Sequence, residues 1–220
     1  MNFKKKWKKT VKQGIEKFGI FPSSRQLDIM AIHGLELIKW NKKFNITSIT
    51  DPLEVAIKHF IDSAVLGCYV PDNIKILDIG SGGGFPGIPL KVIKPLNKVV
   101  MIDASRKKTS FLKHIIRTTN IAEINAFHGR AQDFAKKQDF KQSFDIVVSR
   151  AFTSLKKFLP IACLFLSKNG FVLAMKGSNW GKKEENIKNF QKGNFDMSIY
   201  KYTLSLGNYD RCIIKIKPLI

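Results

Sequence analysis

Five closely spaced glycines mark the part of this chain best suited to binding a ligand. They are Gly80, Gly82, Gly83, Gly84 and Gly87. They follow the apolar run 75–79, which has the length and composition of a buried strand. A glycine turn at the carboxyl end of such a strand points backbone N–H groups at a ligand. The residues therefore predict a site for a nucleotide-like cofactor.

The glycines fit two cofactor motifs. Residues 82–87 match the dinucleotide motif G-x-G-x-x-G, although a single match is weak evidence. Gly80, Gly82 and Gly84 also form G-x-G-x-G, with Asp78 two residues before the first glycine, an arrangement that favours S-adenosylmethionine. A tight glycine turn that binds no ligand is a third explanation.

A second acidic residue and the end of the chain bear on this choice. Asp103 ends the apolar run 98–103, 21 residues after Gly82, where a carboxylate can accept hydrogen bonds from ribose hydroxyls. Both cofactors carry a ribose, so Asp103 does not separate them. Residues 197–206 and 211–217 are typical of two strands joined by a turn. An antiparallel pair that closes the sheet is typical of class I methyltransferases, which favours S-adenosylmethionine.

The elements that must position these residues alternate along the chain. Strands are predicted at 75–79, 98–103, 123–128, 144–148 and 170–175. Helices are predicted at 25–41, 52–68, 106–118 and 155–166. We therefore predict an α/β fold of the class I S-adenosylmethionine-dependent methyltransferase type, a Rossmann-like, mostly parallel sheet that ends in an antiparallel strand pair. The expected division is a helical N-terminal region over 1–68, with a basic head at 1–17, and a core over 69–220.

The charge of the chain indicates a polyanionic partner. Its 220 residues include 38 Lys and Arg against 17 Asp and Glu, a formal net charge of +21. Such an excess of positive charge destabilises the folded chain by self-repulsion unless nucleic acid or an anionic membrane is bound. The cations are spread widely along the chain, which favours nucleic acid. A lysine-rich proteome is the alternative explanation. The lysines around Trp7 could follow a nucleic-acid backbone while the indole stacks on a base, or they could form a solvated tail.

Composition excludes several other classes. Hydrophobic residues make up 44% of the chain, which excludes disorder throughout. Three widely spaced cysteines fit neither a disulfide framework nor a zinc ribbon, and no histidine spacing fits a metal, so we expect no metal. The longest apolar run, 159–166, is too short to span a membrane, and no secretory signal is visible. We expect a cytoplasmic monomer that does not bind membranes.

Several segments together resemble a known family. They are Asn45-Ile46-Thr47, Asp51-Pro52, Lys58-His59, Asp62-Ser63, the run 77–90, Lys107-Lys108, Phe111-Leu112, Arg130, Ser149-Arg150-Ala151-Phe152 and Lys176-Gly177. The likeness covers roughly residues 40–177 and is to the glucose-inhibited division protein B family. Its members are bacterial enzymes that methylate N7 of a guanine in small-subunit (16S) ribosomal RNA. The family usually has Leu where Phe85 stands, and Phe keeps an apolar wall there.

The resemblance implies roles for individual residues. It implies S-adenosylmethionine as cofactor, with Gly80 and Phe85 against it. It matches Asp103 to the acid that binds the ribose. It matches Ala131-Gln132 to the segment that holds the adenine, and Arg150 to an arginine of the cofactor site. Asp78, Gly82 and Gly84 complete the predicted cofactor set from the glycine motif.

The implied chemistry needs no catalytic acid or base. Guanine N7 carries an in-plane lone pair, so methyl transfer requires in-line geometry rather than proton removal. A guanine within an A-form helix hides N7 in a deep groove, so the target must be in a loop or flipped out. We expect recognition through the Watson–Crick edge and stacking. His59 and Asp62, three residues apart on one predicted helix, are expected to pack as a hydrogen-bonded pair rather than to contact substrate.

Three alternatives stay open at this point. The chain could methylate another RNA or a protein. It could be a basic RNA-binding ribosome assembly factor that keeps the fold without turnover. A nicotinamide-dependent oxidoreductase is the third, because the dinucleotide motif matches.

Overall fold

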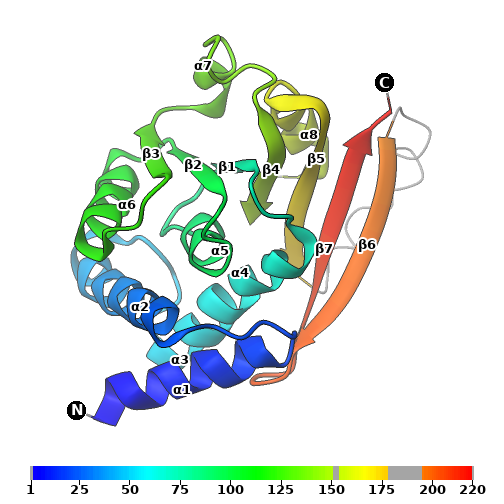
Figure 1. The fold of residues 1–220 in the computed structure, drawn as a ribbon. Coiled ribbons are helices and arrows are strands. Elements are labelled where there is room, and N and C mark those ends of the chain that lie inside the picture. The colour runs from blue at the N-terminus through cyan, green and yellow to red at the C-terminus, as the bar shows by residue number, and fades with distance from the viewer. Residues whose placement is uncertain (1, 151–153, 178–194, 220) are drawn as a thin grey trace.

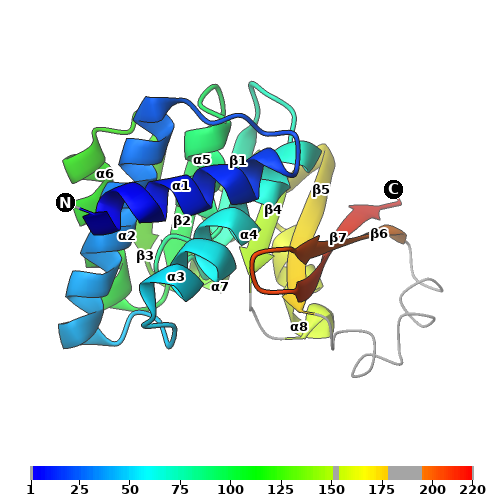
Figure 2. The ribbon, with the colours of Figure 1, turned by 90° about the horizontal axis from the view of Figure 1, so that it is seen from below.

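The computed structural model describes residues 2–150, 154–177 and 195–219, which form a seven-stranded sheet with helices on both faces (Figures 1 and 2). The strands are β1 (Lys75–Ile79), β2 (Lys98–Asp103), β3 (Ile124–His128), β4 (Phe144–Arg150), β5 (Leu166–Gly177), β6 (Phe195–Leu204) and β7 (Tyr209–Pro218). Their order is β3-β2-β1-β4-β5-β7-β6. Neighbouring strands are parallel except where β7 pairs with β5 and β6. The predicted fold class is confirmed.

A group of helices precedes the sheet. They are α1 (Asn2–Glu16), α2 (Ser24–Phe44), α3 (Pro52–Val55), the π-helical segment η1 (Ala56–Ile61), α4 (Asp62–Ala64) and the 3-10 segment η2 (Val65–Tyr69). Asp51 caps α3, since its carboxylate accepts the backbone N–H of Glu54 at 2.8 Å. The predicted helix over 52–68 is therefore present, although its pitch changes three times along its length.

The sheet separates two hydrophobic clusters, because alternate side chains of a strand leave it on opposite faces. On β1, Ile76 joins the cluster that contains α1 to α6, whereas Leu77 joins the cluster that contains α7 and α8. The remaining helices are α5 (Gly87–Ile93), α6 (Arg106–Thr119), α7 (Ala131–Phe134) and α8 (Leu155–Cys163). The N-terminal helices thus pack on the same face as α5 and α6 (Figure 1).

The predicted boundary between the last helix and the fifth strand is wrong, and the two final strands each begin two residues earlier than predicted. The helix expected over 155–166 ends at Cys163, and β5 begins at Leu166 rather than at 170. Leu166 pairs with Phe144 of β4 ahead of an irregularity in the register. The local sequence favours a longer helix here, but pairing with β4 places these residues in a strand.

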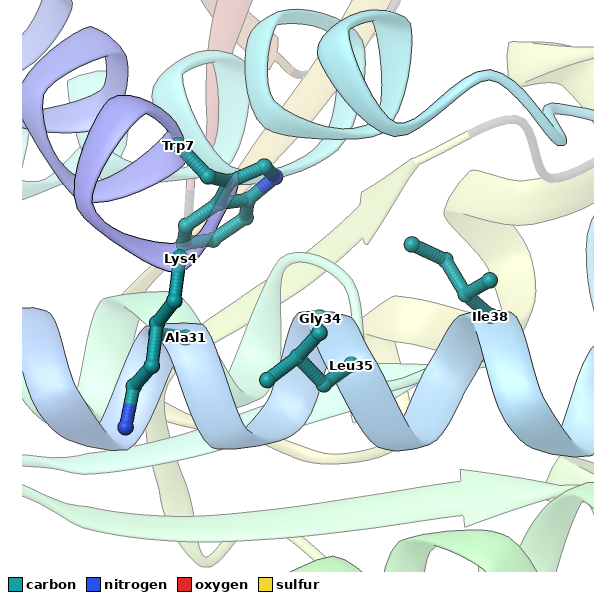
Figure 3. A pocket seen from close by; sticks show the side chains of 6 residues that line it. All are labelled: Lys4, Trp7, Ala31, Gly34, Leu35 and Ile38. Atoms are coloured by element: carbon teal, nitrogen blue, oxygen red, sulfur yellow. The ribbon is translucent and has the colours of Figure 1, made fainter. Parts of the chain in front are cut away.

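The basic head is packed against the protein, which corrects two expectations. The Trp7 side chain is only 5% exposed, its indole N–H donates to the Pro52 carbonyl at 3.0 Å, and its ring meets Phe60 edge-on. Figure 3 shows the indole close to Gly34 of α2, where a Cβ would lie 2.9 Å from the ring. Trp7 is therefore not available to stack on a base, and α1 is not a solvated tail.

The order of the strands shows where a ligand-binding crevice is expected in this sheet. From β1 the chain adds β2 and β3 on one side and β4 and β5 on the other, so the direction of winding reverses between β1 and β4. Ligands of such sheets bind outside the carboxyl ends of the strands at this reversal. In the described part of the chain, no helix is long and apolar enough to cross a membrane.

Candidate functional site

Asp78 holds the glycine loop from behind. The side chain is fully buried at the end of β1, and its Oδ2 accepts the backbone N–H of Gly87 at 2.9 Å. A Cβ at Gly87 would lie 2.8 Å from that oxygen, which explains why a residue without a side chain stands at this position. Burial raises the pKa of Asp78 to about 7. Asp78 therefore shapes the loop, and its contact with the cofactor stays a prediction.

Three glycines of the loop have left-handed backbone conformations. The φ angles are 76° at Gly80, 56° at Gly82 and 93° at Gly84, which side-chain-bearing residues rarely adopt. A Cβ on Gly82 would meet nothing closer than the Gly80 carbonyl at 3.9 Å, so this side of the loop is open. A Cβ on Gly84 would lie 2.6 Å from Ile88. Gly82 therefore faces a ligand space, whereas Gly84 allows the loop to pack on the interior.

Asp103 reaches the same loop from the end of β2. Its Oδ2 accepts the N–H of Gly82 and its Oδ1 accepts the N–H of Ser105, both at 2.8 Å. Each carboxylate oxygen has two acceptor positions, so one on each oxygen stays available. Two neighbouring acceptors suit the two hydroxyls of a ribose. The residues present therefore fit the predicted cofactor.

A cavity of about 210 Å³ opens over the loop, and we call it the loop cavity. It is lined by Ile46, Thr47, His59, Gly80, Ser81, Gly82, Gly83, Phe85, Lys108 and Arg150. Four of the predicted cofactor residues thus line one space, and Asp103 is bonded to one of them. Ala131 and Gln132 begin α7 beyond β3, where Ala131 is buried and Gln132 exposed. Ala131 and Gln132 lie at the same edge of the sheet as Asp103, because Asp103 pairs in register with His128, shortly before them in the chain.

Phe85 is the centre of a stack of three rings. His33 lies on one side of it, with centroids 4.9 Å apart and planes 13° apart, and His59 lies at 4.5 Å and 21°. The His33 Nε2 bonds the Gly83 carbonyl at 2.7 Å. Burial lowers the pKa of His33 to about 4, so the ring is neutral at pH 7. The stack joins α2, the glycine loop and η1 into one wall.

Arg150, the last residue of β4, ties His59 to Asp62. One guanidinium nitrogen donates to the Lys58 carbonyl at 2.6 Å, and another donates to His59 Nδ1 at 2.7 Å. The Asp62 carboxylate lies 3.8 Å from the guanidinium. His59 and Asp62 are both buried, as predicted, but Arg150 lies between them where we expected a direct hydrogen bond. Arg150 therefore lines the loop cavity and also holds other residues of its wall in place.

A larger cavity of about 530 Å³ adjoins the first, and we call it the outer cavity. It is lined by Ile46, Thr47, Ser48, Ile49, Lys58, His59, Asp62, Arg150, Met175, Lys176, Gly177 and Arg211. Ile46, Thr47, His59 and Arg150 line both cavities, so these residues mark where the two meet. Four of the lining residues are cationic, which suits a phosphate-bearing ligand.

Sequence reasoning missed most of the outer cavity. Thr47, Lys58 and Lys176 belong to segments that carried the resemblance, but no role was predicted for them. Arg211 belongs to the predicted final strand, and no local motif distinguishes it. Residues 151 and 152 of the Ser-Arg-Ala-Phe segment lie outside the described residues.

Exposed cations border the site. The end of α2 and the start of α6 lie side by side, with Lys107 Nζ 5.8 Å from the centre of the Phe44 ring. The exposed cations here, which we call the basic ridge, are Lys42, Lys43, Arg106 and Lys107. The next residue, Lys108, lines the loop cavity. Among the described residues, no group of three acidic, His or Cys side chains could hold a metal ion.

Comparison with known proteins gives the family that the sequence resembles. The family described as rRNA small subunit methyltransferase G (GidB) matches residues 26–209. The ribosomal RNA small subunit methyltransferase G of Geobacter sp. (strain M21) is 40% identical over 181 residues, 82% of this chain and 82% of that protein. The protein of the same name from Acetivibrio thermocellus is 33% identical over 214 residues, 96% of this chain and 88% of that protein.

Solved structures share the fold. An S-adenosylmethionine-dependent methyltransferase from Aquifex aeolicus aligns with a TM-score of 0.58 at 15% identity, over 78% of this chain and 96% of that chain. A methyltransferase from Thiobacillus denitrificans, in complex with S-adenosyl-L-homocysteine, aligns with a TM-score of 0.53 at 14% identity, over 71% of this chain and 90% of that chain. At these identities the likeness concerns the fold alone.

Proposed function

The chain belongs to the rRNA small subunit methyltransferase G family, and on this premise we propose that it transfers a methyl group from S-adenosylmethionine to N7 of a guanine in small-subunit (16S) ribosomal RNA. Family membership supports the cofactor and the ribosomal substrate. The choice of N7 rests on the sequence resemblance and on the chemistry of the site.

The observation that carries the proposal is the pair of adjoining cavities. Methyl transfer between two bound molecules requires that their sites share an opening, so that donor and acceptor can line up. The loop cavity has the glycine turn and Asp103 for a nucleoside cofactor. The outer cavity has room and positive charge for a nucleotide of RNA. Thr47, His59 and Arg150 lie where the two spaces meet.

The side chains at this junction suit a reaction without proton removal. When bound, S-adenosylmethionine supplies a methyl group on a positively charged sulfur, which the N7 lone pair can attack directly. Burial and the charge of Arg150 lower the pKa of His59 to about 2, so His59 is a poor proton acceptor at neutral pH. Asp62 is held by Tyr202, whose hydroxyl donates to Oδ1 at 2.7 Å. These residues therefore orient and enclose the reactants.

Further proposals follow for the protein as a whole. We propose a helical region over 1–68 and a methyltransferase core over 69–220, which fold together because one hydrophobic cluster contains residues of both. A cytoplasmic location follows from a ribosomal substrate in bacteria. We propose that the protein acts as a monomer. Family membership does not favour the alternatives of a different substrate, a non-catalytic assembly factor or an oxidoreductase.

The test is methyl transfer from labelled S-adenosylmethionine to small ribosomal subunits that lack the modification, followed by mass spectrometry of the nucleosides. We expect label in 7-methylguanosine at one position. Label in another nucleoside would refute the N7 assignment and leave the enzyme class intact. Cofactor binding without any transfer to RNA would instead favour a different substrate.

A further inference from the structure

The hydrogen bonds around Thr47 fix the direction in which its hydroxyl can bond. Its Oγ1 lies 2.9 Å from His59 Nε2 and accepts the backbone N–H of Ile49 at 3.1 Å. A hydroxyl has two acceptor positions and one proton to donate. The direction of the contact with His59 therefore decides what Thr47 can offer to a ligand.

Arg150 decides that direction. A guanidinium can only donate, so the contact of 2.7 Å makes His59 Nδ1 an acceptor. A neutral imidazole whose Nδ1 accepts must carry its proton on Nε2. His59 Nε2 therefore donates to Thr47. The low pKa of His59 agrees with a neutral ring.

The Thr47 hydroxyl can consequently donate one hydrogen bond to a ligand but cannot accept another. Both of its acceptor positions are filled by His59 and Ile49. Within residues 2–150, 154–177 and 195–219, nothing receives the hydroxyl proton. The side chain lines both the loop cavity and the outer cavity. Thr47 thus presents a pure hydrogen-bond donor at the place where the two cavities meet.

A pure donor at this place distinguishes guanine from adenine. Next to N7, guanine has the O6 acceptor, whereas adenine has an amino group that donates. Because N7 must face the methyl donor, O6 lies beside the junction as well. We propose, building on the proposed function, that the Thr47 hydroxyl donates to O6 of the acceptor guanine and selects this base over adenine.

Arg150 and His59 are then positioning residues, since they act through Thr47. The buried carboxylate of Asp62 lies 3.8 Å from both Arg150 and Arg211, and Tyr202 donates to it. This chain of contacts holds the arginine and thereby keeps His59 in the tautomer that donates to Thr47.

The test combines a change in the enzyme with a change in the base. Small subunits are reconstituted with ligated rRNA that carries either guanine or 2-aminopurine, which lacks O6 but keeps N7, at the methylated position. The rate constant kcat/KM is measured for the wild type and for Thr47→Val, Thr47→Ser and Thr50→Val. Thr50 is an exposed residue of the same loop and serves as the control. Calorimetry with S-adenosyl-L-homocysteine measures cofactor affinity separately.

We expect the wild type to prefer guanine by about tenfold, the value of about one hydrogen bond. Thr47→Val should lose about tenfold on guanine and little on 2-aminopurine, so that the preference disappears. Thr47→Ser and Thr50→Val should keep the preference, and cofactor affinity should stay constant throughout.

Two results would overturn the inference. A Thr47→Val enzyme that is slower yet keeps the wild-type preference would show that Thr47 only supports the fold. A loss of cofactor affinity in Thr47→Val, with the preference intact, would direct the hydroxyl to the cofactor instead. Failure of the wild type to methylate guanine at all would refute the proposed function itself, and the inference with it.

Discussion

Replacing Asp103 by alanine tests the cofactor site most directly. The carboxylate accepts the N–H groups of Gly82 and Ser105 and has one acceptor position left on each oxygen. Two hydrogen bonds from ribose hydroxyls to a charged acceptor are each worth about 1.5–3 kcal/mol. Taking the lower value, because the side chain keeps some contact with solvent, the loss is about 3 kcal/mol, or about 150-fold in Kd.

The assay is calorimetric titration with S-adenosyl-L-homocysteine, together with filter binding of ribosomal RNA. We expect the cofactor Kd of Asp103→Ala to rise by about two orders of magnitude while RNA affinity changes less than threefold. Asp139→Ala is the matched control, since it removes the same charge from an exposed loop. A thermal melt identifies any loss of fold.

The outcome that refutes the reasoning is a folded Asp103→Ala protein that binds cofactor within threefold of the wild type. Asp103 would then only tie Gly82 to the end of β2, a structural role that the hydrogen bond of 2.8 Å alone explains. Equal loss of cofactor and RNA affinity with a normal melt would also contradict the assignment.

Three further predictions concern stability and RNA binding. Trp7→Ala should lower the free energy of unfolding by about 3–5 kcal/mol in urea titrations, whereas Phe21→Ala, at a side chain that is 78% exposed, should change it little. Burial raises the pKa of Asp78 to about 7, so the unfolded chain binds fewer protons between pH 4 and 7 and stability falls as pH rises through this window. Asp78→Asn should remove up to about 4 kcal/mol of that fall, measured as the difference between the two proteins' unfolding free energies at pH 4 and pH 8, and parallel pH profiles would contradict it. Replacing the four cations of the basic ridge by glutamine should flatten the salt dependence of RNA affinity by about 3 in log–log slope and leave cofactor affinity unchanged; an unaltered slope would place the RNA elsewhere.

Much of the fold was predictable because its signals are local. Each strand of the core is a short apolar run, and the turn after β1 needs glycines at positions with positive φ. The burial of α1 was also visible in principle. Trp7, Val11 and Ile15 recur at four-residue spacing and form its buried stripe. The high lysine content of the segment is instead typical of a solvated, charged helix or tail.

The outer cavity was not predictable in the same way, because its residues come from separate parts of the chain. Asp62 precedes the sheet, Arg150 ends β4, and Arg211 belongs to the last strand. Their contacts exist only once β7 has paired with β5 and brought Arg211 opposite Gly177. No spacing along the sequence reports such an arrangement.

The cost of burying these charges supports a functional role for them. Asp62 lies almost fully inside the protein and the Arg150 side chain is only 17% exposed, and burial lowers the pKa of Arg150 and raises that of Asp62. A pair of apolar residues would often stabilise such a position equally well or better. Apolar residues, however, could not set the tautomer of His59 and so could not fix which way Thr47 donates. An ion pair in the protein interior that orients a neutral histidine beside the loop cavity is therefore better explained by the proposed base selection than by stability.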